Sequence, residues 1–305
     1  MLRFTLRQLE HALAIAELGS LAKAAQHLGV AQPSLSASLQ KLEAQLGLQL
    51  FIRHHAQGVS PSPQGLRFLN EARSLVAHGN DFQRDSTVAG MLVEGELTIG
   101  SFSTIAPVYA PKLIAGFQTQ HPKARIKLEE GAQEQLLAGL RAGHYDLVLF
   151  YTLDMQDDLE VTELARLKPY VLLNASHSLA KKKRVSLHDL TSEPLILLDI
   201  LPSRTYFTRL LESQGIVPKI NFASPSLELV RGLVGQGLGY SLLITRPHGD
   251  ATYDGEQLAI RPIVEEVEDG VIAIAALKSL RPTRLISTFE EFCVNFFKQI
   301  HPKRP

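Results

Sequence analysis

The fold is decided near the start of the chain, by the stretch SLAKAAQHLGVAQPSLSASLQKLEAQLGLQL, which runs from residue 20 to residue 50. Its apolar residues recur at the i, i+3, i+4, i+7 spacing of two amphipathic helices. Gly29 lies between the two segments, where a glycine commonly ends a helix. Pro33 lies in the first turn of the second segment, where its missing N–H costs little. The stretch therefore predicts a helix-turn-helix at about residues 21–40, with Ser20 as the N-cap.

The second of these helices is expected to keep a short and polar outer face. Four leucines between residues 35 and 46 form its inner stripe. A helix that enters the major groove of DNA needs such an outer face, because bulky or acidic side chains would hold it away from the bases and phosphates. An ordinary helical hairpin with solvated serines fits the same pattern, and the flanking segments favour the DNA-binding alternative. The expected outer residues are Gln32, Ser34, Ser36, Ala37, Ser38 and Lys41.

The flanking segments complete a winged domain. An amphipathic helix is expected ahead of the stretch, at residues 6–18. Behind it, residues 50–53 and 59–60 are expected to pair as a short β-hairpin, with His54 and His55 in a basic tip. Adjacent histidines at a strand end point to opposite sides and rarely chelate one ion, so we expect a wing or phosphate contact there and no metal site.

Several short motifs in the same order resemble those of the LysR-type transcriptional regulators. They are A-A-x-x-L at residues 24–28, Q-P-S-L-S at 32–36, L-E-x-x-L-G at 42–47, L-F-x-R at 50–53 and S-P-x-G at 62–65. The resemblance covers the whole chain. It implies an all-α winged helix-turn-helix domain at residues 1–61, a linker and dimerisation helix at 62–90, and an effector-binding domain at 91–305.

The resemblance also implies which residues contact DNA. Gln32, Pro33, Ser36 and residue 37 would lie at the base edges, and Arg53 would lie in the wing. Many members of the family carry arginine at position 37, where this chain has Ala37, so a methyl group that suits a thymine methyl replaces a long hydrogen-bonding side chain. We therefore expect a changed site preference and retained DNA binding. The full set of expected DNA-binding residues is Ser20, Gln32, Pro33, Ser34, Ser36, Ala37, Lys41 and Arg53.

The segment at residues 62–88 is expected to be one long helix, capped by Ser62 and started by Pro63. Its apolar face is narrow, which suits pairing with a second chain. A dimer is what a winged regulator needs, because a two-fold protein reads a dyad-symmetric operator. We therefore expect a homodimer or homotetramer. The alternative is that this helix packs on the next domain of its own chain.

From Glu96 the chain alternates short apolar strands with amphipathic helices, which predicts a parallel α/β sheet. The order then repeats, and residues 131–150 align without a gap with residues 224–243. Two βαβαβ units make two lobes, similar to the periplasmic-binding-protein-like effector domain of the LysR-type family. The expected fold class is thus α/β multidomain. Lobe 1 would hold residues 95–167 and 270–301, and lobe 2 residues 168–269, with crossings near Leu167 and Asp269.

The two lobes are expected to hold a ligand between them. In parallel sheets, ligands bind beyond the carboxyl ends of strands, where helix N-termini favour anions. Arg204 would clamp a carboxylate, unless it pairs with Asp199. The alternative for the hydroxyls is that they only cap helices. The expected effector is a carboxylate or another small anion. Its expected contacts are Ser101, Ser103, Thr104, Gln133, Phe150, Ser203, Arg204, Thr205, Ser224 and Ser226.

Composition limits the other classes of function. Lysine plus arginine and aspartate plus glutamate both number 31, and no apolar run reaches the length of a membrane span. The single cysteine, Cys293, excludes an intrachain disulfide and the paired-cysteine peroxide switch of some LysR-type relatives. We find no nucleophile elbow, phosphate loop, dinucleotide turn or metal-ligand spacing, so neither an enzyme nor a cofactor is expected.

The chain is therefore expected to be a cytoplasmic transcriptional regulator and not an enzyme. Its expected partners are double-stranded DNA, a small-molecule effector, a second copy of itself and RNA polymerase, without a membrane. Two alternatives stay open at this point. One is a ligand-binding module that acts through a protein partner, and the other is an enzyme housed in the α/β half.

Overall fold

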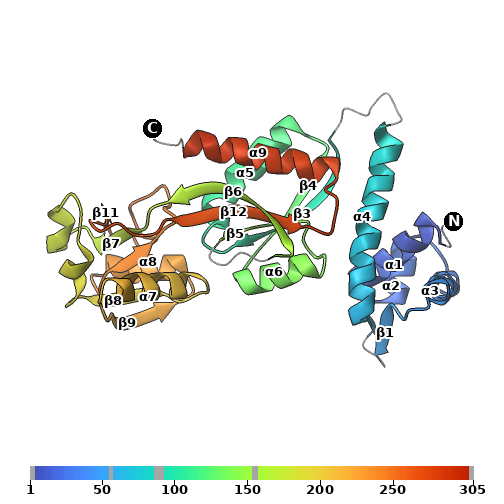
Figure 1. Ribbon diagram of the computed structural model, residues 1–305, viewed down its shortest axis with the longest axis horizontal. Helices are drawn as coiled ribbons and strands as arrows, with labels where there is room; N and C mark the ends of the chain where they lie inside the picture. The colour runs from blue at the N-terminus through green and yellow to red at the C-terminus, as the bar shows by residue number, and fades with distance from the viewer. Residues whose placement is uncertain (1–3, 55–57, 86–92, 153–156, 302–305) are drawn as a thin grey trace.

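The computed structural model describes residues 4–54, 58–85, 93–152 and 157–301. A helical N-terminal domain, a long helix and a two-lobed α/β part follow one another along the chain (Figure 1). Within the described residues, no helix combines the length and the apolar character that crossing a membrane requires.

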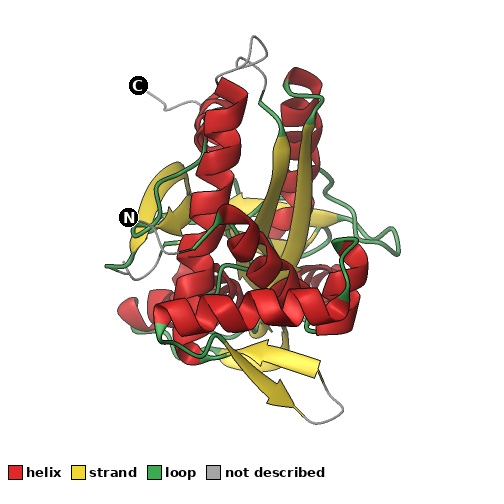
Figure 2. Cartoon of the chain, turned by 90° about the vertical axis from the view of Figure 1, so that its right-hand side faces the viewer, coloured by secondary structure: helices red, strands yellow, loops and turns green. Residues whose placement is uncertain are grey.

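The N-terminal domain contains α1 (Leu6–Leu18), α2 (Leu21–His27), α3 (Gln32–Leu46) and a hairpin of β1 (Phe51–His54) and β2 (Gly58–Pro61). The hairpin lies at the lower end of the molecule in Figure 2, and its register pairs Phe51 with Pro61 and His54 with Gly58. The predicted helix-turn-helix and wing are confirmed. The helix α3 continues past residue 40 because Gly47 ends it in the left-handed conformation, with φ of 67°. The domain core includes Leu9, Ile15, Ala24, Leu35, Leu42 and Leu50.

The long helix α4 (Pro63–Asp85) packs against both the N-terminal domain and the α/β part of the same chain. Ser62 Oγ accepts the amide of Gly65 (2.9 Å) and donates to the Gln49 carbonyl (2.6 Å), so Ser62 caps α4 as predicted. Leu69 is buried in the N-terminal core beside α1. One position further, Asn70 Nδ2 donates to the Arg141 carbonyl in the α/β part (2.6 Å). This part of α4 therefore packs on the next domain of its own chain, which was the alternative to pairing with a second chain. The end predicted for the linker, at residue 90, lies outside the described residues.

The first lobe is built on a sheet in the order β4-β3-β5-β12-β6. The strands β3, β4 and β5 are parallel, and β12 pairs antiparallel with both β5 and β6. The helices α5 and α9 cover one face, and α6 lies on the other (Figure 1). The bounds are β3 Gly95–Phe102, α5 Ala106–Gln120, β4 Ala124–Gly131, α6 Gln133–Arg141, β5 Leu147–Tyr151, β6 Leu159–Leu167, β12 Gly270–Leu277 and α9 Arg284–Ile300.

The second lobe repeats this plan. A parallel bridge from Leu195 to Tyr240 joins β8-β9 to β10-β7-β11, which gives the order β9-β8-β10-β7-β11. The strand β7 pairs antiparallel with β10 and β11, as β12 does in the first lobe. The bounds are β7 Tyr170–Asn174, η1 Ser178–Lys181, η2 Leu187–Leu190, β8 Pro194–Leu198, α7 Ser203–Ser213, β9 Lys219–Ser224, α8 Leu227–Gly235, β10 Ser241–Leu243 and β11 Leu258–Pro262.

The chain crosses between the two sheets twice, from β6 to β7 and from β11 to β12. The parallel halves of both lobes match the predicted repeat. The strands β6, β7 and β11 were not predicted from the sequence. The strand β3 continues through Phe102, so Ser101 lies in the strand and not in the turn before α5.

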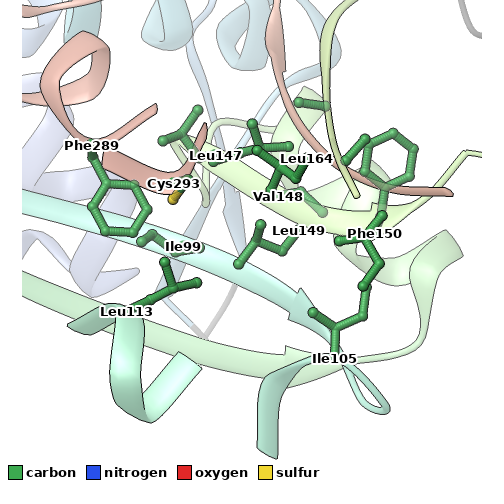
Figure 3. Close-up of a cluster of buried hydrophobic side chains, with 14 of the residues drawn as sticks. Ile99, Ile105, Leu113, Leu147, Val148, Leu149, Phe150, Leu164, Phe289 and Cys293 are labelled. Atoms are coloured by element: carbon green, nitrogen blue, oxygen red, sulfur yellow. The ribbon is translucent and has the colours of Figure 1, made fainter. Parts of the chain in front are cut away.

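The core of the first lobe surrounds the middle of its sheet (Figure 3). Ile99 and Leu149 from adjacent strands lie with Phe289 and Cys293 of α9 in this cluster. Cys293 is fully buried, and this burial raises the pKa of its thiol well above the ordinary value. Cys293 is thus a core residue of the first lobe.

Gly65 sets how closely the wing approaches α4. A Cβ atom at this position would lie 2.0 Å from the Leu50 carbonyl oxygen and 2.8 Å from its carbon. We expect Gly65→Ala to destabilise the N-terminal domain by about 2 kcal/mol, because the backbone must shift. Urea unfolding followed by circular dichroism measures this. Gly232→Ala, in the open on α8, is the control and should be neutral or stabilising by roughly 0.5 to 1 kcal/mol. Equal stability of the two variants would contradict the expectation.

Candidate functional site

The helix α3 presents an outer face of small and polar side chains. Leu35, Leu39 and Leu42 are buried, so the opposite side of the helix points away from the domain. Ser38 differs from the prediction, since its Oγ lies 2.8 Å from Nδ1 of His11 and the side chain is half-buried. The exposed residues on this face are Gln32, Pro33, Ser34, Ala37 and Lys41, and Ser36 is half-buried beside them.

This outer face is free of carboxylates for a structural reason. Glu43 is the only acidic residue in the sequence of α3. Its Oε1 accepts the backbone amides of Leu50 (2.7 Å) and Phe51 (3.3 Å). The carboxylate therefore holds the start of the wing against α3 and does not oppose an approaching phosphate.

Two further elements border this face. Arg53 is exposed on β1, and Nε2 of His54 lies 2.7 Å from Oγ of Ser60 across the hairpin. His55 lies outside the described residues. Ser20 Oγ accepts the amide of Lys23 (3.4 Å), so Ser20 caps α2 as predicted. The structure thus gathers the predicted DNA-binding residues around α3, the start of α2 and the wing.

The cleft between the lobes contains a small pocket lined by hydroxyl groups. Thr104 precedes α5 in the first lobe, and Ser203 opens α7 in the second. Tyr151 and Thr245 complete the polar lining, and their hydroxyls are hydrogen-bonded to each other. The cavity measures about 10 Å³, which is about the room that one water needs. Its apolar lining comes from Leu198, Phe207, Leu227, Leu243 and Ile244.

Burial raises the pKa of the tyrosine in this pocket. Tyr151 is buried, and the removal of water around it raises the pKa of its phenol well above the ordinary value. The Tyr151 hydroxyl is therefore neutral at physiological pH. Its hydrogen bond with Thr245 uses one of the two hydroxyl protons, so one of the pair can still donate to a ligand and both can accept.

Two predicted serines near the start of α5 have unused hydroxyls. Ser101 is fully buried at the end of β3, and Ser103 is half-buried in the turn that follows. Among the described residues, neither Oγ atom finds a hydrogen-bond partner. Buried hydroxyls without a partner are uncommon, so both remain candidates for contact with a ligand or water.

The other predicted residues on the second lobe are already engaged. Ser226 Oγ accepts the amide of Leu229 (3.3 Å) and caps α8, and Ser224 Oγ accepts the amide of Ser226 (3.1 Å). Arg204 is exposed and forms an ion pair with Asp199. The alternatives raised from the sequence therefore hold for Ser226, which caps a helix, and for Arg204, which pairs with Asp199, while Ser224 bonds locally in the turn before α8.

The remaining predicted residues do not lie in the small pocket. Gln133 bonds the Tyr151 backbone in both directions, at 3.0 and 3.1 Å, and so braces β5. Gln133 and Thr205 line a larger groove between α6 and α7. Phe150 packs in the core of the first lobe (Figure 3). The predicted effector residues are thus divided between a small pocket, a larger groove and the core.

Sequence reasoning missed Tyr151 and Thr245. Tyr151 ends β5, and Thr245 comes two residues after the end of β10. These are the third parallel strands of the two lobes. The rule that ligands bind beyond the carboxyl ends of parallel strands applies to them as well. Applying it to all the parallel strands would have found both residues.

Two family models match the chain. The model described as "Bacterial regulatory helix-turn-helix protein, lysR family" matches residues 6–66, and the "LysR substrate binding domain" matches residues 92–298. Among curated proteins, the HTH-type transcriptional regulator CfxR of Cupriavidus necator is 30% identical over 254 residues, which are 83% of this chain and 79% of CfxR.

Solved structures agree with these matches. HinK, a LysR family transcriptional regulator from Pseudomonas aeruginosa, is 40% identical with a TM-score of 0.66, and the match covers 96% of this chain and 99% of HinK. A full-length OxyR variant from Pseudomonas aeruginosa is 25% identical with a TM-score of 0.78, and the match covers 98% of this chain and 96% of OxyR.

CfxR and HinK are named as transcriptional regulators and not as enzymes. The match to a helix-turn-helix model also favours DNA over a protein partner as the target of the N-terminal domain. The chain is therefore a member of the LysR family of transcriptional regulators, with an N-terminal helix-turn-helix and a C-terminal effector-binding domain.

Proposed function

We propose that this protein is a cytoplasmic regulator that reads a dyad-symmetric DNA operator and responds to a small anionic molecule held between the two lobes. The observation that carries the DNA-binding part is the outer face of α3, which is exposed, small and free of carboxylates because Glu43 is bonded to the wing. Such a face enters a major groove without electrostatic opposition.

The residues divide into two roles on DNA. Gln32 has an amide that can bond an adenine edge in two places, and Ala37 offers a methyl group. Lys41, Arg53 and the start of α2 at Ser20 suit phosphates, which fix position without reading sequence. Discrimination between bases would therefore rest on few side chains, and affinity would depend strongly on salt.

A two-fold operator needs at least two copies of the chain, so we propose a homodimer or homotetramer. One exposed apolar surface lies on the second lobe, where Ile220 and Phe222 of β9 are 50% and 40% exposed. Leu238, whose carbonyl accepts a hydrogen bond from Asn221 of β9 (3.3 Å), and Leu229 of α8 are also exposed. Another lies on α4, where Leu75 is 42% and Phe82 is 79% exposed. Bound at a promoter, such an assembly would act on RNA polymerase.

The proposed effector is a carboxylate or another small anion. Thr104 and Ser203 lie at the starts of α5 and α7, where backbone amides carry partial positive charge. Tyr151 and Thr245 add hydroxyls from the strand ends. The cavity of about 10 Å³ is too small for an organic acid, so the lobes must move apart to admit one. Binding would then shift the population of lobe arrangements towards the opened one. The size of this shift is limited by the difference between the ligand's affinities for the open and the closed arrangement.

A footprint on the DNA upstream of the protein's own gene, taken across a salt series, tests the DNA-binding proposal. We expect a dyad-symmetric protected region for the natural protein. Ala37→Arg should shift the preferred base at one position of each half-site by about 1 to 3 kcal/mol. Ala138→Arg, exposed on α6, adds the same charge far from α3 and should change nothing. No protection at low salt would contradict the proposal, and an unchanged preference would remove residue 37 from base contact.

The effector proposal is tested by repeating the footprint with a pool of small carboxylates. One of them should change the extent of protection. Ser203→Ala and Thr104→Val should both abolish that response and leave protection without ligand unchanged, because neither residue lies near α3. Ser226→Ala is the matched control, since Ser226 only caps α8. A normal response in both pocket variants would contradict the assignment.

Self-association should depend on the exposed face of β9. Phe222→Glu places a charge in that apolar surface and should lower the assembly state seen by sedimentation velocity, because a buried unpaired charge is costly. Val264→Glu, at an apolar position 48% exposed outside this face, is the control and should sediment as the natural protein does. Identical sedimentation of both variants and the natural protein would contradict a role for β9.

A further inference from the structure

A small cavity lies between the long helix α4 and the first lobe, which Figure 1 shows side by side. It measures about 90 Å³, which is room for a molecule of roughly six water-sized groups. All of its described lining residues belong to α4 and the first lobe, so it is separate from the cleft between the lobes. The α4 side is formed by Asn70, Arg73, Ser74 and Ala77, whose spacing places them on one face of the helix.

The packing of α4 on the lobe fixes the width of this cavity. At its edge, Asn70 Nδ2 donates to the Arg141 carbonyl (2.6 Å). Gly143 makes this approach possible, because a Cβ atom there would lie 2.0 Å from Asn70 Oδ1. Much of the remaining lining is apolar, which suits the body of a small molecule. It includes Leu140, Tyr145, Leu277, Leu280, Pro282 and Ile286.

Two charged groups of the lining compensate each other. Arg73 of α4 donates to Asn70 Oδ1 (3.2 Å), and Asp146 of the lobe accepts the amide of Thr98 (2.8 Å). Burial lowers the pKa of Arg73 and raises that of Asp146. The attraction between the two opposite charges works against both shifts, so each favours the charged form of the other.

Two further carboxylates of the lining lack such compensation. Glu290 of α9 is half-buried, and burial raises the pKa of its carboxyl. The negative charge of Glu160, on β6, raises the pKa of Glu290 further. Among the described residues, neither carboxylate has a hydrogen-bond or ion-pair partner, and Arg281 is exposed on the turn before α9. A cation bound in the cavity would therefore stabilise both carboxylates in their charged form.

We propose that this cavity is a ligand site for a small primary amine with a short apolar chain. The ammonium group lies against Glu160 and Glu290, and the chain lies among the apolar side chains of the lining. Such a ligand contacts α4 and the first lobe together, so it stabilises the arrangement in which the two are packed. The site thus joins the helix that carries the DNA-binding domain to the sensor, independently of any effector in the cleft.

Ligand-observed NMR titrations of the full chain test the site with three probes of one carbon skeleton: 3-methylbutylamine, 3-methylbutanol and 3-methylbutanoate. The amine should bind at least about tenfold more tightly than the alcohol, and the carboxylate should bind most weakly. The affinity for the amine should fall with added salt, because its charge contributes to binding. A carboxylate that binds as tightly as the amine overturns the proposal, as does the absence of binding by all three probes at millimolar concentration.

Three variants locate the site. The double variant Glu160→Gln/Glu290→Gln removes both charges and should weaken amine binding by about tenfold. Ala77→Leu fills the cavity from the α4 side without changing any charge, and it should also weaken amine binding by about tenfold. Glu291→Gln, at an exposed position of α9 outside the lining, is the matched control and should leave amine binding unchanged. A correctly folded double variant with undiminished affinity overturns the assignment.

Hydrogen–deuterium exchange followed by mass spectrometry tests the contact with both parts of the chain. The amine should slow amide exchange in residues 70–77 of α4 and in the turn at residues 280–283, and it should leave α3 unchanged. Thr104→Val, in the small pocket of the cleft, should leave this protection unchanged whether or not the anionic effector proposal is correct. Protection that is confined to the lobe, without slower exchange in α4, contradicts the proposed position of the ligand.

Discussion

The two lobes are tied together because the chain crosses between their sheets twice, with the whole second lobe inserted between β6 and β12 of the first. The strand β7 completes the second sheet immediately after the chain leaves β6, and β12 completes the first sheet after the chain leaves β11. Both strands pair antiparallel with two neighbours, so removing either would detach the edge strand beyond it. The lobes can therefore bend about two connections but cannot separate. Both openings between them, on the two sides of α7, must change together when they bend.

The elements that local sequence could predict are those that local interactions form. The helix-turn-helix follows from apolar spacing, the N-cap at Ser20 and the glycine between the helices, all within one short stretch. The parallel βαβ halves follow from alternating strand and helix patterns. By contrast, β6 and β11 form through pairing with distant segments. The strand β6 pairs with β12, and β11 pairs with β7, and both partners lie far away in the chain. Their own sequences are partly polar, so no local pattern separates them from loops.

The candidate site was harder to predict because side-chain direction is set by packing. Every residue of β5 is buried, since helices cover both faces of the sheet, so strand alternation could not tell Phe150 from Tyr151. Phe150 points into the core, and Tyr151 reaches the pocket. Arg204 has the right charge for a carboxylate ligand, but Asp199, five residues earlier, already pairs with it. The sequence identifies side chains with suitable chemistry for a ligand. The fold decides which of these side chains face one another.

The sharing of α4 between two neighbours has a consequence for how such proteins can be recombined. Leu69 and Ala72 belong to the core of the N-terminal domain, while Asn70 and Arg73, interleaved with them, lie against the Gly143 turn of the first lobe. No cut point in this helix separates the two sets. A gene fusion that transplanted this DNA-reading domain onto a foreign sensor would carry Asn70 and Arg73 with it. The new sensor would have to offer a matching carbonyl and a glycine turn, or the graft would lose its fixed orientation.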